Sequence, residues 1–144
     1  MTTIVNAIVT AAHASLAAAP AIAPTVSRVR LRPLPQGAGT AVVVRPMQAQ
    51  ASAADLPGMP IAWAVQFAVD CYARCPQPGT PDQAVDALLE AAYARLMQDT
   101  TLGGAAFPLD PQGVSYEFDT DGEQTACATL LFVAQARANH ATFT

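Results

Sequence analysis

The segment Ile61–Arg74 most constrains the fold. Its residues divide by alternate positions into two sides, as in a β-strand, and both sides are largely apolar. One side carries large apolar residues, namely Ile61, Trp63, Val65, Phe67, Val69 and Cys71. The other side carries three alanines among its six residues, namely Ala62, Ala64, Gln66, Ala68, Asp70 and Tyr72. An antiparallel strand with one solvated face shows polar residues at every second position. We therefore predict a β-strand over 61–74 in a sheet that is covered on both faces.

The last strand that we predict, over residues 124–137, has the same two-sided character. Leu130 and Phe132 point to one side of it, and Leu131 and Val133 point to the other. Only two helices are predicted in the chain, and two helices are enough for one sheet face. The second face is therefore expected to meet something outside this chain, and another copy is the simplest candidate.

Two helices are indicated by apolar residues at steps of three and four. The first covers residues 2–18 and ends before Pro20. The second begins at Thr80 as N-cap, with Pro81 in its first turn and Gln83 completing a capping box, and closes near Gln98.

Besides the two strands already named, we predict strands over 25–32, 40–45 and 114–120. The turn at Asp121-Gly122 joins the strands over 114–120 and 124–137 as a hairpin. The order is α-β-β-β-α-β-β. The fold class is therefore α+β, with a mostly antiparallel sheet of four to five strands and two helices packed on one face, in a single domain over 1–144.

Residues 46–60 have no clear period and contain three prolines, so we predict a long mobile loop there. Its apolar residues Met47, Leu56 and Met59 are candidates for docking on a partner. Residues 138–144 are expected to form a short C-terminal tail.

The composition also points to an assembled protein. Charged residues make up 12% of the chain, against about 25% in a typical soluble domain, and there is no lysine. Hydrophobic residues make up 52%, and the mean hydropathy is +0.27. This is more apolar surface than one small domain hides by itself, so a membrane or other protein chains must cover the excess.

The charge-free stretch over 1–27 does not fit a membrane span or a signal peptide. Polar residues and prolines interrupt it, and its start has no basic residue. We interpret it as the first helix of a mature cytoplasmic protein.

The sequence carries no recognisable catalytic, metal or cofactor motif. The three cysteines fit a reducing compartment, and Cys71 and Cys75 would lie about 13 Å apart along one strand face, too far for a disulfide. Buried, inert thiols are the favoured interpretation, and a nucleophilic pair of Cys127 with His13 is the weaker alternative. We expect no catalytic residue, no metal and no cofactor.

The few charges fall into two groups of opposite sign. Arg28, Arg30 and Arg32 alternate along one strand face, and Glu117 and Asp119 do the same near the hairpin. Arginine suits bidentate pairing with carboxylates, so both groups, together with Leu131 and Val133, are candidates for a subunit interface. Direct DNA binding by the arginines fits poorly with a net charge of −4 and a pI near 4.8.

Several segments together carry a family resemblance: Ile61–Arg74, Pro81–Leu89, the turn Asp99–Gly104, the strand Tyr116–Asp119 and the closing strand Ala128–Phe132. In this order the chain, from about residue 25 onward, resembles the tail terminator or minor tail proteins of long-tailed bacteriophages. The resemblance rests on the order of elements and on diffuse positions.

The resemblance implies a non-enzymatic virion protein, made in the host cytoplasm, that forms a ring of six copies at the head–tail junction. Such a ring caps the tail tube, ends its polymerisation and offers the surface for head joining. The implied partners are the chain itself, the tail tube protein and a head-completion or neck protein, with no membrane. DNA would pass through the hole without specific binding, and six copies at −4 each would carry about −24.

Two alternatives remain open. The nearer one is another neck component, such as a head–tail connector or tail completion protein. The more remote one is a small ligand-binding domain or enzyme whose apolar residues line a pocket.

Overall fold

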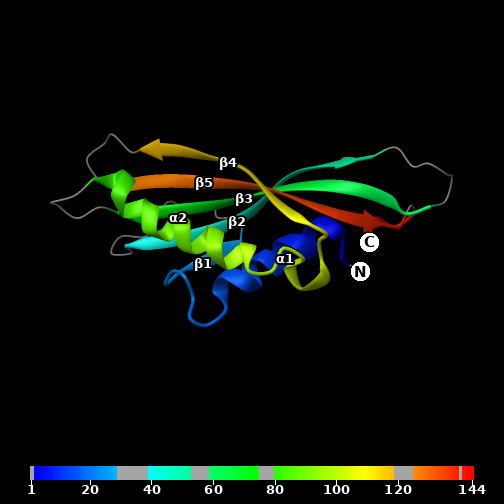
Figure 1. The fold of residues 1–144 in the computed structure, drawn as a ribbon, viewed down its shortest axis with the longest axis horizontal. Coiled ribbons are helices and arrows are strands. Elements are labelled where there is room, and N and C mark those ends of the chain that lie inside the picture. Colours follow the sequence, from blue (N-terminus) through cyan, green and yellow to red (C-terminus); the bar gives the residue numbers. More distant parts are fainter. Residues whose placement is uncertain (1, 29–38, 53–58, 75–79, 119–124, 140) are drawn as a thin grey trace.

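The computed structural model describes residues 2–28, 39–52, 59–74, 80–118, 125–139 and 141–144. Its elements are α1 (Ile4–Ala17), β1 (Val26–Arg28), β2 (Thr40–Ala51), β3 (Ile61–Arg74), α2 (Pro81–Met97), the 3-10 turn η1 (Leu102–Gly104), β4 (Leu109–Phe118) and β5 (Thr125–Ala138). The five strands form one sheet in the order β1-β2-β3-β5-β4 (Figure 1). β1 is parallel to β2, and all other neighbours are antiparallel. The predicted fold class and element order are confirmed.

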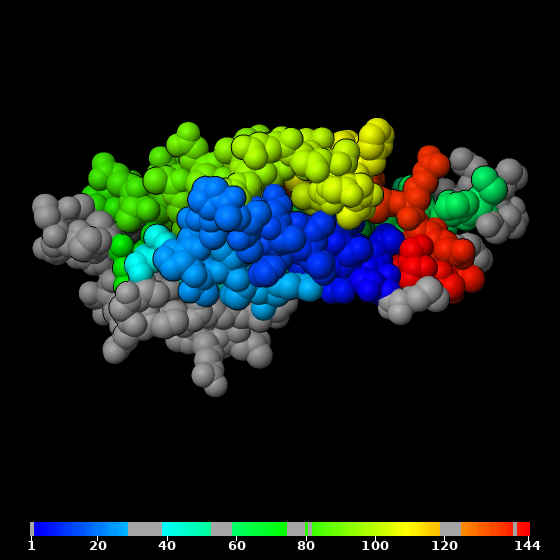
Figure 2. All heavy atoms as spheres, turned by 90° about the horizontal axis from the view of Figure 1, so that it is seen from below, coloured from blue at the N-terminus to red at the C-terminus, as the bar shows by residue number. Residues whose placement is uncertain are grey.

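Both helices lie on the same face of the sheet, side by side (Figures 1 and 2). α1 contacts β1 and β2, and α2 contacts β3 and β5. Between them and the sheet lies the core, in which the rings of Phe67 and Phe132 stack with centroids 5.5 Å apart. The side of Ile61–Arg74 that carries Val65, Phe67 and Val69 faces this core.

Arg95 of α2 binds the C-terminal end of α1. Its guanidinium donates to the carbonyl oxygens of Ser15, Ala18 and Pro20 at 3.0, 2.9 and 2.6 Å. The last turn of α1 has no basic residue of its own, so Arg95 supplies the donors and the positive charge that a helix C-terminus favours. This contact fixes the two helices relative to each other.

The start of α2 is confirmed at Pro81, but the predicted capping box is wrong. The Thr80 side chain caps no helix N–H group. Its hydroxyl instead hydrogen-bonds the Asp82 carboxylate, which lowers the pKa of Asp82. A carboxylate in the first turn is favoured by the helix dipole, so Asp82 takes the role that the cap was expected to play.

The predicted loop over 46–60 begins too early. Residues 46–51 continue β2 and pair with β3, from Pro46 opposite Phe67 to Ala51 opposite Trp63. The register shifts between Pro46 and Gln48, at a proline that has no backbone N–H to donate to a neighbouring strand. Residues 53–58 lie outside the described residues.

The other boundaries differ by a few residues. β4 begins at Leu109 rather than at residue 114, and β1 is described only over Val26–Arg28. The Asp121-Gly122 turn lies outside the described residues, although β4 and β5 do pair as a hairpin would.

The C-terminal tail is part of the fold rather than a free end. The N–H of Ile4 donates to the Phe143 carbonyl at 3.2 Å, and the Phe143 ring lies 4.6 Å from the Trp63 ring. The two chain ends therefore lie together at one end of the molecule (Figure 1).

Candidate assembly surfaces

The sheet face opposite the helices, called here the second face, carries a polar cluster at its centre. The Arg45 Nε donates to Asp70 Oδ2 at 2.7 Å, and the Thr129 hydroxyl donates to Asp70 Oδ1 at 2.6 Å. Asp70 is buried, and so are its neighbours Val43 and Ala68. The centre of this face is thus already buried in a single chain, and the prediction that another chain meets the second face concerns the residues around this centre.

Leu131 and Val133 lie on the second face as predicted, beside this cluster on β5. Each is only half-buried, whereas Leu130 and Phe132 between them are buried in the core. These two residues mark the part of the second face that still exposes apolar surface. Their role in a subunit contact stays a prediction.

The two described cysteines are unsuited to nucleophilic chemistry. Burial raises the pKa of Cys71 to about 12, and burial also raises the pKa of Cys127. Cys127 lies on the second face opposite Tyr72, while His13 belongs to α1 on the other face and its Nε2 lies 3.1 Å from the Val26 carbonyl oxygen. The sheet separates the pair, so the Cys127–His13 alternative is wrong.

The part of the chain that the structure describes holds no group of three or more histidine, cysteine or acidic residues near enough to bind a metal ion. Within the same part, no helix has the length and apolar character needed to span a membrane.

The outer strand β4 exposes large apolar side chains at one edge of the sheet. Val114, Tyr116 and Phe118 are 44, 48 and 50% exposed, and all three lie on the helix side. The rings of Tyr116 and Phe118 stack at 6.2 Å with an interplanar angle of 5°. An edge strand with exposed aromatic residues is a typical place for another chain to pair or pack.

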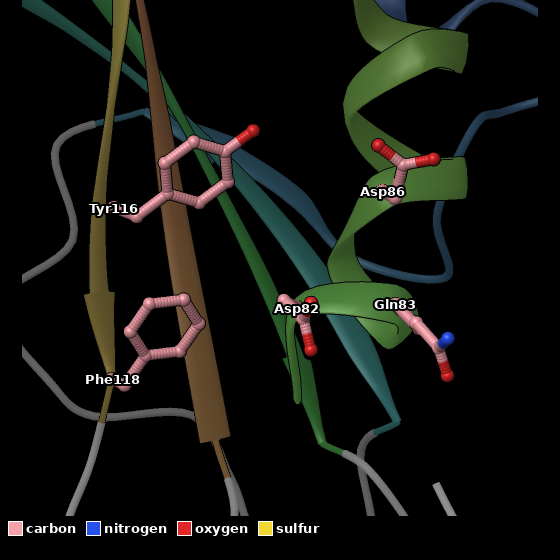
Figure 3. Close-up of a pocket in the computed structure, with 5 residues that line it drawn as sticks. All are labelled: Asp82, Gln83, Asp86, Tyr116 and Phe118. Atoms are coloured by element: carbon pink, nitrogen blue, oxygen red, sulfur yellow. The ribbon is translucent and has the colours of Figure 1, made fainter. Parts of the chain in front are cut away.

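A groove of about 410 Å³ lies between these rings and α2. Tyr116 and Phe118 form its β4 wall, and Asp82, Gln83 and Asp86 line it from the first turns of α2 (Figure 3). We call this the β4–α2 groove. One wall is aromatic and the other acidic, so it suits a ligand that is both apolar and basic.

At the opposite edge of the sheet, Arg28 is held by α1. Its guanidinium donates to Asn6 Oδ1 at 2.6 Å and to Thr10 Oγ1 at 3.0 Å, and the side chain stays exposed. Both partners are neutral, so the positive charge at this edge is not compensated by a described carboxylate. Arg30 and Arg32 lie outside the described residues.

At one end of the sheet, β2 and β3 extend beyond the helices (Figure 1). Met47 in β2 and Met59 just before β3 are 46 and 52% exposed. We call residues 46–51 and 59–64 the β2–β3 arm. Leu56 lies outside the described residues.

On the acidic side, Glu117 is exposed on β4 and points to the second face, away from the β4–α2 groove. Asp119 lies outside the described residues. The sequence analysis missed Tyr116, Phe118, Asp82 and Asp86 as a site. The alternation of Val114, Tyr116 and Phe118 is visible in the sequence, but only the fold brings α2 alongside.

The sequence matches no family model and no curated protein. Among solved structures, a chain of the "Virion of native gene transfer agent (GTA) particle" has the same fold, with a TM-score of 0.52 and 16% identity. The likeness covers 90% of this chain and 94% of that chain. At this identity it establishes a shared fold over nearly the whole of both chains.

Proposed function

We propose that this protein is a structural virion subunit, and that it forms a ring which caps the tail tube, ends tube polymerisation and offers the surface for head joining. The observation that carries the proposal is the fold shared, over 90% of the chain, with a component of a virion particle. The order of elements that resembles the tail terminator proteins supports the finer role.

The surfaces of the chain fit assembly better than they fit catalysis. The described residues offer inert thiols, no metal cluster and an exposed apolar edge strand. The two outer strands of the described sheet, β1 and β4, differ in residues and in charge. Contacts between two different surfaces of one chain repeat head to tail, and they close into rings when the rotation allows.

In this proposal the β2–β3 arm docks on the tail tube or on the neck. Its exposed methionines are adaptable apolar side chains of the kind that bind variable surfaces. The net charge of −4 per copy gives the ring an overall negative charge, which suits a passage that DNA crosses without being held.

The test is to delete the gene from the genome that carries it and to examine the particles by electron microscopy. A terminator leaves tails of irregular, excessive length without attached heads, because nothing stops the tube. A different neck component leaves tails of normal length that fail to join heads. Particles of normal form and number would contradict the proposal as a whole.

A further inference from the structure

We propose that the β4–α2 groove of one copy receives the edge of a second copy that carries Arg28, namely β1 with the adjoining part of α1. The inference deepens the proposed function and rests on its statement that copies of this chain contact one another. It names the two surfaces that meet.

Among the residues that the structure describes, none supplies a positive partner to the groove. Asp82 and Asp86 are exposed, and neither forms a salt bridge with another described residue. The hydrogen bond from Thr80 lowers the pKa of Asp82. Both carboxylates lie in the groove beside two stacked rings that are about half exposed.

The Arg28 edge offers the matching chemistry. Asn6 and Thr10 hold the guanidinium in place, and no carboxylate among the described residues pairs with its charge. A guanidinium forms bidentate hydrogen bonds with carboxylates and also packs on aromatic rings, so one side chain suits both walls of the groove. Because Arg28 is already positioned, little side-chain entropy is lost on binding.

The topology places the two surfaces where copies can repeat. β1 and β4 are the opposite edges of one sheet. Arg28 pairs with Val44, and Tyr116 pairs with Ala128, and both of these partners face the helix side. β1 runs parallel to β2, while the three steps from β2 to β4 are all antiparallel, so β4 runs opposite to β1. A second copy displaced across the sheet thus brings its β1 antiparallel to β4, with Arg28 on the side of the groove.

The experiment is a charge exchange, read by sedimentation equilibrium of the full chain over a wide concentration range. Asp86→Arg alone and Arg28→Glu alone are each expected to weaken self-association by about tenfold or more. The variant that carries both changes again places opposite charges across the contact, with the two signs exchanged. It is expected to recover most of the lost self-association. Asp110→Arg makes the same charge change on β4 but on the second face, and is expected to leave self-association unchanged.

Circular dichroism and thermal unfolding of each variant show whether it is folded. Because Arg28→Glu also removes the bonds to Asn6 and Thr10, Tyr116→Ser serves as an independent change on the groove side, and it too is expected to weaken self-association.

Self-association of folded Asp86→Arg at wild-type strength, or a doubly changed variant no stronger than the single ones, would overturn the inference. So would a wild-type chain that stays monomeric at every concentration. If rings form but the charge changes have no effect, the inference fails and the proposed function stands. If the charge exchange works but gene deletion leaves the particles normal, the proposed function fails and the contact stands.

Discussion

Arg45 and Asp70 form an ion pair that runs diagonally across two neighbouring strands of the sheet. Arg45 stands opposite Ala68 in the register, and Asp70 stands opposite Val43, yet their side chains meet at 2.7 Å. Asp70 also accepts from Thr129 of β5, so one buried carboxylate joins the three central strands β2, β3 and β5. These bonds fix the register of the sheet on the face that the helices leave free.

Arg45→Met is expected to lower the free energy of unfolding by about 2 kcal/mol, measured by urea denaturation. The change leaves the Asp70 carboxylate buried with Thr129 alone. The expected loss stays below the roughly 3–5 kcal/mol of a fully buried pair, because the Arg45 side chain is 40% exposed. Arg137→Met, at an exposed position on β5, is the control and should change stability by less than about 0.5 kcal/mol. Equal stability of the two variants would show that the pair does not stabilise the sheet.

Arg95→Ala is expected to lower the free energy of unfolding by about 2 kcal/mol, because three carbonyl oxygens at the end of α1 lose a charged donor. Hydrogen exchange should show faster opening of the last turn of α1, with β3 amides affected only through global unfolding. Arg95→Lys keeps the charge but not the fork of donors, and should recover less than half of the loss. Full recovery with lysine would mean that charge alone matters there.

Stability is expected to fall as the pH rises above about 9. The pKa of Cys71 is raised from 9.0 to about 12 in the folded chain, so the folded state holds its proton while the unfolded state releases it. The stabilisation that comes from the protonated Cys71 thiol is fully present below pH 9. It is lost between pH 9 and pH 12, where the free energy of unfolding falls by about 1.4 kcal/mol per pH unit. Urea denaturation at stepped pH values measures the decline, and Cys71→Ala should make it shallower. A decline of the same slope in Cys71→Ala would assign the effect to other groups, among them Tyr72, whose pKa burial also raises to about 12.

Replacing Met47 and Met59 with glutamine should separate docking from folding. Both side chains are about half exposed, so the free energy of unfolding should change by less than about 0.5 kcal/mol. In the proposed role the double variant binds purified tail tubes about tenfold more weakly, measured by co-sedimentation. Gln50→Ser, an exposed polar change in the same arm, is the control. Unchanged binding of the methionine variant would remove the arm from the docking surface.

The sequence predicted best where a pattern acts within one element. β3 runs from Ile61 to Arg74 as predicted, because its alternation is complete and prolines flank it. The end of β2 was missed because residues 46–51 hold a proline and no β-branched residue. Those residues pair through backbone hydrogen bonds with β3, and nothing in their own side chains signals that pairing.

The candidate surfaces depend on contacts between distant residues, which a pattern within one element does not contain. Arg45 and Asp70 are 25 residues apart and meet only through the strand register. The β4–α2 groove joins Asp86 to Tyr116, which the fold brings together across β5. Arg28 was singled out from its alternation with Arg30 and Arg32, but its fixation by Asn6 and Thr10 became visible only with α1 in place.

The proposal that this chain is a ring-forming subunit can be tested by the mass of the purified protein in solution. Size-exclusion chromatography with light scattering, repeated at rising concentration, is predicted to show a closed species near six times 14.9 kDa. A species of 14.9 kDa at every concentration, also after purified tail tubes are added, would contradict the claim.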